Sequence, residues 1–245
     1  MEARLRPPRK IVLGDRNSRF RALGWATADI LDADFLVNLR DGRLPWESGS
    51  IRILYTSHLI EHLDPEASAA LFREIHRVLE PAGTARFACP DLAKIRRAYE
   101  REDLDFFLRP SVRAYLQDGI ERLGFRKEAM LLHHNLLRTL ASYGGTGEGP
   151  YAPAEVVAQN YVSMDRYAFA DWCVSLLDPE RLGLDEPWGH VNAWDYRKLE
   201  CALRDAGFRQ VRESSFRRSQ VAELRDQRFD LARHRWISMY VEAGK

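Results

Sequence analysis

The stretch from Leu44 to Pro90 constrains the fold of this chain more than any other, because it reads as one β-α-β unit. Residues 51–57 (IRILYTS) are rich in β-branched and aromatic side chains, which is typical of a buried strand. Apolar side chains then recur at helical spacing through residues 67–79, at Leu71, Phe72, Ile75, Val78 and Leu79. Pro81 and Gly83 end that helix, and residues 85–89 return as a strand. Two strands joined by such a helix run parallel, so we predict an α/β fold.

The order of these elements resembles that of class I S-adenosylmethionine (SAM) dependent methyltransferases, in particular a methyltransferase type 11-like subgroup. That family runs LPF, an apolar strand, H-hydrophobic-hydrophobic-E-H-L, REIxRVLxPGG and a strand, and this chain has LPW, IRILYTS, HLIEHL and REIHRVLEPAG. The resemblance implies a Rossmann-like sheet that is mostly parallel with an antiparallel last strand, and a methyltransferase as the enzyme class. It also implies SAM as the cofactor.

The residues upstream continue the resemblance and supply the expected cofactor site. Residues 10–13 form the first strand, Gly14 opens the cofactor turn, and Asp29 ends the second strand. In the family an acid at this last position binds the ribose, because a carboxylate can accept two hydrogen bonds from a vicinal diol. The resemblance further implies that the adenine is flanked by Asn38, Leu39 and Arg40 and that the methyl face is lined by Ser57 and His58.

Arg16 departs from the family pattern, in which a second glycine lets the backbone approach the methionine part of SAM. A guanidinium there either blocks the ligand or pairs with its carboxylate. Asn38 stands where an acid is common, and Arg52 stands where the strand usually begins with Phe-Asp. Loss of the cofactor site is therefore the alternative to SAM binding.

The cofactor half of the chain is contracted. Between Gly14 and Gly24 there is too little chain for a full crossover helix, which needs about a dozen residues. One face of the sheet is therefore expected to be partly uncovered.

Composition limits the partners and the cellular setting that can be expected. The chain has 245 residues, of which 45% are hydrophobic and 30% charged, and a formal net charge of +1, so neither a nucleic-acid partner nor a membrane is expected. The basic runs at 217–218 and 233–235 are interpreted as solvated faces or sheet-edge decoration rather than phosphate-binding sites. Three scattered cysteines, no CxxC and no apolar segment of signal-peptide length favour a cytoplasmic protein.

Residues 91–192 are expected to form a helical insertion, or lid, in a core made of residues 1–90 and 193–245. Helical periodicity runs through 91–143, with an interruption at Pro110, and through 153–177, and four glycines between 144 and 149 offer a hinge. Both ends of the insertion lie on the rim where open parallel sheets bind ligands, so it should close over the acceptor. Its helices could equally cover the bare sheet face or meet a second subunit in a homodimer.

Histidines are the candidate bases, because their pKa lies near neutrality. His190, in the loop GHVNAW, is the first choice, followed by His58 at a strand end and His133 in an insertion helix, where either His133 or its neighbour His134 faces inward. His62 and His76 are assigned to packing or capping. Residues 58–62 also spell the metal motif H-x-x-E-H, but the strand end at His58 and the break at Asp64-Pro65 argue against one metal-binding helix, so no metal is expected.

These patterns together predict a SAM-dependent methyltransferase that acts on a small-molecule or glycan-like acceptor, a role that the resemblance associates with natural-product or polysaccharide biosynthesis. The alternative is a methyltransferase fold that has lost methyl transfer. Such a protein would catalyse another reaction or serve as a noncatalytic partner in a biosynthetic complex.

Overall fold

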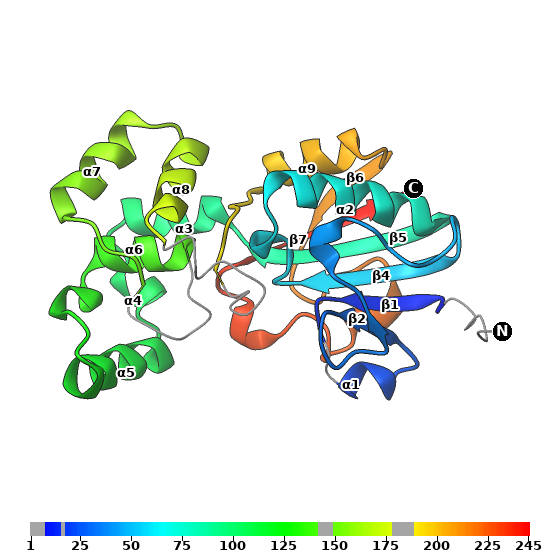
Figure 1. Cartoon of the computed structure of the whole chain (residues 1–245), viewed down its shortest axis with the longest axis horizontal. Helices are drawn as coiled ribbons and strands as arrows, with labels where there is room; N and C mark the ends of the chain where they lie inside the picture. The colour runs from blue at the N-terminus through cyan, green and yellow to red at the C-terminus, as the bar shows by residue number, and fades with distance from the viewer. Residues whose placement is uncertain (1–7, 16–17, 142–148, 178–188) are drawn as a thin grey trace. The chain divides into compact units, whose positions relative to one another are not determined.

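A seven-stranded sheet forms the core of the protein (Figure 1). The computed structural model describes residues 8–15, 18–141, 149–177 and 189–245, and in these ranges the strand order is β3-β2-β1-β4-β5-β7-β6. All neighbouring strands are parallel except at β7, which is antiparallel to both β5 and β6. The expected fold class is therefore confirmed. The strands are β1 (Lys10–Leu13), β2 (Ala26–Asp29), β3 (Phe35–Leu36), β4 (Ile51–Ser57), β5 (Leu79–Pro90), β6 (Gln210–Ser214) and β7 (Ser238–Gly244).

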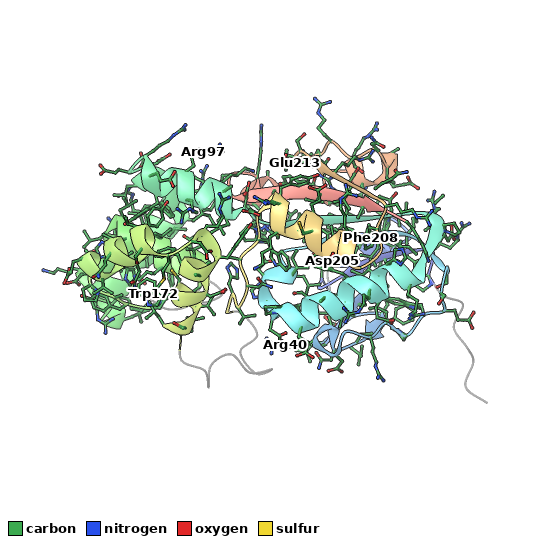
Figure 2. The ribbon with its side chains drawn as sticks, turned by 90° about the horizontal axis from the view of Figure 1, so that it is seen from above. Arg40, Arg97, Trp172, Asp205, Phe208 and Glu213 are labelled. Carbon is green, nitrogen blue, oxygen red and sulfur yellow. The ribbon has the colours of Figure 1, made fainter. Side chains whose placement is uncertain are left out.

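One face of the sheet is covered by α2 (Pro65–Val78) and α9 (Tyr196–Asp205). Each helix begins at an aspartate whose carboxylate accepts a backbone N–H: Asp64 from Ala67 at 2.8 Å, and Asp195 from Lys198 at 2.9 Å. Asp205 ends α9, and Phe208 follows it into the core (Figure 2). The periodic apolar side chains of α2 are fully buried in this main cluster, as predicted: Leu71, Phe72, Ile75 and Val78.

The opposite face is covered by a segment that the sequence patterns did not single out. The crossover after β1 is the short helix α1 (Ser18–Arg21), which confirms the contraction. The chain between β6 and β7, which includes η6 (Ala222–Arg225) and η7 (Ala232–His234), packs on the bare face. Phe229 from this segment lies 4.8 Å from Trp25 and 5.0 Å from Tyr55, ring centre to ring centre. The β6–β7 segment therefore covers the sheet face that was expected to be bare and for which the insertion helices were one candidate cover.

A buried arginine ties the same segment to the sheet. Arg86 of β5 is fully buried, and its Nε donates to Asp230 Oδ1 at 3.2 Å while Nη1 lies 3.1 Å from Glu242 Oε1. Its Nη2 also donates to the carbonyl of Ser215 at 3.0 Å. Burial, and then the negative charge of Asp230, raises the pKa of the Tyr55 hydroxyl far above its usual value. An arginine buried at this depth is stable only because its donors are paired.

The insertion folds as a second compact unit. Contacts divide the chain into one unit of residues 1–90 and 194–245 and another of residues 91–193, so the second boundary lies one residue beyond the one expected. The predicted helical stretch from 153 to 177 is two helices, because Asp165 accepts hydrogen bonds from Tyr167 N and Ala168 N and starts a new one. The elements are α3 (Leu92–Glu100), α4 (Leu104–Phe107), α5 (Pro110–Asp118), η3 (Gly119–Leu123), η4 (Lys127–Met130), α6 (Leu132–Leu140), α7 (Ala154–Ser163) and α8 (Arg166–Ser175).

Two further observations bear on the sequence expectations. None of the described helices combines the length and the apolar character that crossing a membrane demands. All three cysteines carry free thiols, and two of them, Cys89 and Cys173, are buried. Gly144, Gly145 and Gly147 of the expected hinge lie outside the described residues.

Candidate functional site

The carboxyl ends of β1, β2 and β4 meet at one edge of the sheet, because these three neighbouring strands are parallel. Gly14 directly follows β1 with φ 74° and donates its N–H to the carbonyl of Ala28 at 2.9 Å. A Cβ at this position would lie 2.9 Å from the Leu59 side chain, so both the backbone angle and the space require glycine. Arg16, two residues further, lies outside the described residues.

Asp29 stands at the end of β2 with its carboxylate half-buried. The N–H of Ile30 donates to its Oδ1 at 2.6 Å, and within the described ranges this is the one hydrogen bond that the carboxylate accepts. The strand end is fixed in turn by Val37, whose N–H donates to the Asp29 carbonyl at 2.9 Å. Oδ2 is therefore available to a ligand hydroxyl, as ribose binding requires.

A second aspartate near this strand has a structural task. Asp34 accepts hydrogen bonds from Thr27 N at 2.9 Å and Thr27 Oγ1 at 3.0 Å, and pairs with Arg21 Nε at 2.8 Å. Burial raises the pKa of the Asp34 carboxyl, but these hydrogen bonds and the arginine outweigh it and hold that pKa below its usual value. Asp34 therefore shapes the turn between β2 and β3, and Asp29 stays the acid that is predicted to bind a ligand.

The predicted adenine segment forms the short helix η1 (Leu39–Asp41). Asn38 caps it: its Oδ1 accepts from Arg40 N at 3.2 Å, and its Nδ2 donates to Asp41 Oδ1 at 2.9 Å. Leu39 is buried in the main core, whereas the Arg40 side chain is half-buried (Figure 2). A nucleobase here would meet the backbone of 38–40 and Arg40 rather than the Asn38 amide.

His58 is held in a fixed orientation at the end of β4, next to the half-buried Ser57. Its backbone has φ 53°, and its N–H donates to the Ala88 carbonyl at 2.8 Å. Its ring nitrogens face two buried side chains, with Nε2 at 2.8 Å from Ser238 Oγ and Nδ1 at 3.1 Å from Glu61 Oε1. Both ring nitrogens thus lie close to a protein oxygen, and a role for His58 in proton transfer stays a prediction.

His234 is the residue of this rim that sequence reasoning missed. Its ring centre lies 4.1 Å from that of His58, with 47° between the planes. Burial, and then the neighbouring His58 and Arg233, lowers the pKa of His234 to about 3, so the ring is neutral at physiological pH. The interpretation of 233–235 as solvated surface is wrong for this side chain. No periodic pattern surrounds it, and the one available signal was its position just before β7.

The other predicted histidines belong to the insertion unit, apart from His62 and His76. His190 is half-buried and directly follows an isolated bridge residue, Gly189. Burial lowers the pKa of His133, which is half-buried on α6, while its neighbour His134 is fully buried and takes the inward position. The roles of His190 and His133 in proton transfer stay predictions. His76 packs edge-on against Phe208 with ring centres 5.2 Å apart, in keeping with the packing role predicted for it.

The H-x-x-E-H letters do not lie on one helix. His58 follows β4, and Glu61 and His62 lie in the short helix η2 (Ile60–His62). The backbone therefore differs from the single α-helix on which that metal motif depends.

One comparison with known proteins matches part of the chain to a family model. A family model described as "Methyltransferase domain" matches residues 12–87, which confirms the resemblance and the enzyme class read from the sequence. No curated protein matches the chain.

The solved structures that it matches are distant. A SAM-dependent methyltransferase from Mesorhizobium loti is 15% identical with a TM-score of 0.46, and the match covers 98% of this chain and 93% of that one. A SAM-dependent methyltransferase from Thermotoga maritima, described as a possible histamine N-methyltransferase, is 12% identical with a TM-score of 0.40, over 98% and 83% of the two chains. A SAM-dependent methyltransferase from Archaeoglobus fulgidus is 12% identical with a TM-score of 0.43, over 98% and 87%. The fold assignment rests on the strand order itself rather than on these matches.

Proposed function

We propose, from the premise that residues 12–87 form the cofactor half of a class I methyltransferase domain, that this protein transfers a methyl group from SAM to a small-molecule or glycan-like acceptor. The observation that carries the proposal is the sheet order, which puts Gly14, Asp29 and His58 on the ends of three adjacent parallel strands. This is the rim at which open α/β sheets bind ligands.

The described residues fit such a cofactor in two respects. Asp29 Oδ2 is available to a ribose hydroxyl, and the backbone of η1 lies one strand further along the same rim. SAM bound here would supply an electrophilic methyl group on a sulfonium. The chain's own contribution is to align the acceptor with that group and to exclude water, which is often sufficient for methyl transfer without a dedicated base.

Two observations favour the alternative, a fold that has lost methyl transfer. The close approach allowed by Gly14 is occupied by Leu59 of this chain, and Arg16 stands where the family has its second glycine. Both features narrow the space for the methionine end of the cofactor. Binding of SAM and S-adenosylhomocysteine (SAH) therefore decides between the two readings.

The first test is calorimetric titration of SAM and SAH into the wild type and Asp29→Ala. Loss of the ribose acceptor should weaken binding by about 1–3 kcal/mol. Asp205→Ala makes the same change at the exposed end of α9 and should bind as the wild type does. Equal affinity of Asp29→Ala and wild type would remove the ribose assignment, and no binding by the wild type would favour the alternative.

The second test replaces Arg16 by glycine, which restores the family's turn. Weaker SAM binding in Arg16→Gly would identify the arginine as a clamp on the cofactor carboxylate, since it removes a charged hydrogen-bond partner. Markedly tighter binding would identify it as a block and favour loss of methyl transfer in the natural protein. The same calorimetric titration of SAM distinguishes a loss of affinity from a gain.

Acceptor choice is assigned to the insertion unit, with His190 and then His133 as the candidate bases. Its helices and loops rejoin the core at Trp194, where Nε1 donates to the Ile60 carbonyl at 3.1 Å. A role in natural-product or polysaccharide biosynthesis, and a cytoplasmic setting, are part of this proposal. His190→Ala should lower turnover by about a hundredfold once an acceptor is in hand and leave SAH affinity unchanged.

A further inference from the structure

The β6–β7 segment presents an unusual histidine at the ligand rim. His234 Nε2 lies 3.1 Å from Nε of Arg233, and an arginine N–H can only donate. Nε2 must therefore be the accepting nitrogen, and the neutral ring carries its hydrogen on Nδ1. That Nδ1 is buried and has no hydrogen-bond partner among the described residues. An enclosed donor without a partner costs free energy, which a ligand oxygen would recover.

The ring is fixed, so its donor points in one direction. The backbone around it is held by the N–H of His234 to the Leu231 carbonyl at 3.0 Å and by the N–H of Ile237 to the His234 carbonyl at 3.2 Å. The ring also packs against that of His58, tilted by 47°, and His58 is in turn oriented by Ser238 and Glu61. A fixed donor loses little entropy when it binds a ligand.

The charges around His234 favour an anionic oxygen. Arg19 and Arg233 both act on the ring as positive neighbours, and Glu61 acts in the opposite sense. A carboxylate facing Nδ1 would accept its hydrogen and offset Arg233, since Arg19 already pairs with Asp15 at 3.1 Å.

The sheet order indicates which end of the cofactor would reach this donor. Asp29 ends β2, β1 comes next, and His58 with His234 lies beyond it at β4. Two interstrand spacings are roughly 10 Å, so a ligand with its ribose at Asp29 extends along the rim toward His234 with its amino-acid end. We propose that His234 binds the carboxylate of the cofactor's amino-acid moiety through Nδ1–H. This inference rests on the proposed function, since it needs SAM or SAH at this rim.

The test compares two ligands in the full chain. SAH carries the amino-acid carboxylate, whereas 5′-methylthioadenosine keeps the adenosine and the sulfur but lacks the amino acid. His234→Phe keeps a ring against His58 and removes both nitrogens, and His234→Asn keeps an N–H near the position of Nδ1. Calorimetry gives both dissociation constants for each protein, and their ratio within one variant cancels any partial loss of folded protein.

We expect His234→Phe to weaken SAH binding about tenfold and to leave methylthioadenosine binding unchanged, because one hydrogen bond to a charged group is lost. His234→Asn should bind SAH within about twofold of the wild type. His76→Phe, the same change on α2 against Phe208, should bind both ligands normally.

Three outcomes would overturn the inference and leave the proposed function in place. Unchanged SAH affinity in His234→Phe would mean that water or a rearranged protein group satisfies the donor. Equal weakening for both ligands would make His234 a general support of the rim. A wild type that binds methylthioadenosine and SAH equally well would show that the carboxylate is not recognised. If the wild type binds neither ligand, the proposed function fails first and this inference with it.

Discussion

At the scale of single residues, the most constrained position of the rim is His58. A non-glycine residue in the left-handed region costs of the order of 1 kcal/mol or more, so the surrounding contacts must hold it there. The Ala88 carbonyl, Ser238 and Glu61 do so from three elements. The sequence placed this histidine at a strand end. It gave no signal of the left-handed backbone, because such a conformation is usually predicted from a glycine and not from a histidine. The neighbouring His234 was not predicted either, because its contact with His58 depends on how the chain leads into the antiparallel strand β7.

His234 makes a testable contribution to stability at the residue scale. Its pKa is about 3 in the folded protein, against an ordinary 6.5 in the unfolded chain. Between those values the unfolded chain binds the extra proton, so this contribution is complete above pH 6.5 and declines as the pH falls toward 3. We expect the melting temperature of His234→Phe to fall less between pH 7 and pH 5 than that of the wild type. Thermal melts followed by circular dichroism measure this, and parallel pH profiles for the two proteins would contradict it.

At the scale of elements, the sequence predicted the strands and helices whose apolar side chains recur with a regular spacing. The strands at 10–13 and 51–57 and the helix α2, whose apolar side chains pack on the main core, appear with nearly the expected bounds. The β6–β7 segment was not predicted as a cover, because short turns of helix with scattered Leu224 and Phe229 have no period. Arg86 was likewise read as one residue of a strand, although its partners lie more than a hundred positions away.

The Arg86 network supports a prediction about how this cover is attached. Asp230→Asn leaves the buried guanidinium with one fewer charged partner and should destabilise the protein by about 3 kcal/mol or more. Glu80→Gln breaks the exposed pair with Arg9 and should cost less than about 1 kcal/mol. Urea unfolding of both variants gives the two values. Similar small costs would mean that apolar packing around Phe229, and not the ion network, holds the segment.

At the scale of the whole molecule, the proposed cofactor binding and the proposed acceptor choice belong to different units. All the described residues assigned to the cofactor rim lie in the unit of residues 1–90 and 194–245, and the insertion has a small core of its own around Leu108, Leu116 and Ala129. The sequence predicted an insertion at 91–192, and the compact unit of residues 91–193 begins where β5 ends and stops just before Asp195, which caps α9. It carried no comparable signal for the acceptor, since residues that recognise a substrate follow no backbone period.

This division predicts how a cofactor acts on unfolding. Two compact units with separate cores should unfold in two calorimetric transitions, because a protein of two units need not be two-state. SAH binds folded residues of the sheet unit alone in our proposal, so at about a hundred times its dissociation constant it should stabilise that transition by about 2.7 kcal/mol. The other transition should stay in place, and Asp29→Ala should show a smaller shift at the same SAH concentration. A single transition that moves as a whole would show instead that the units unfold together, and a wild type with no shift would argue against cofactor binding.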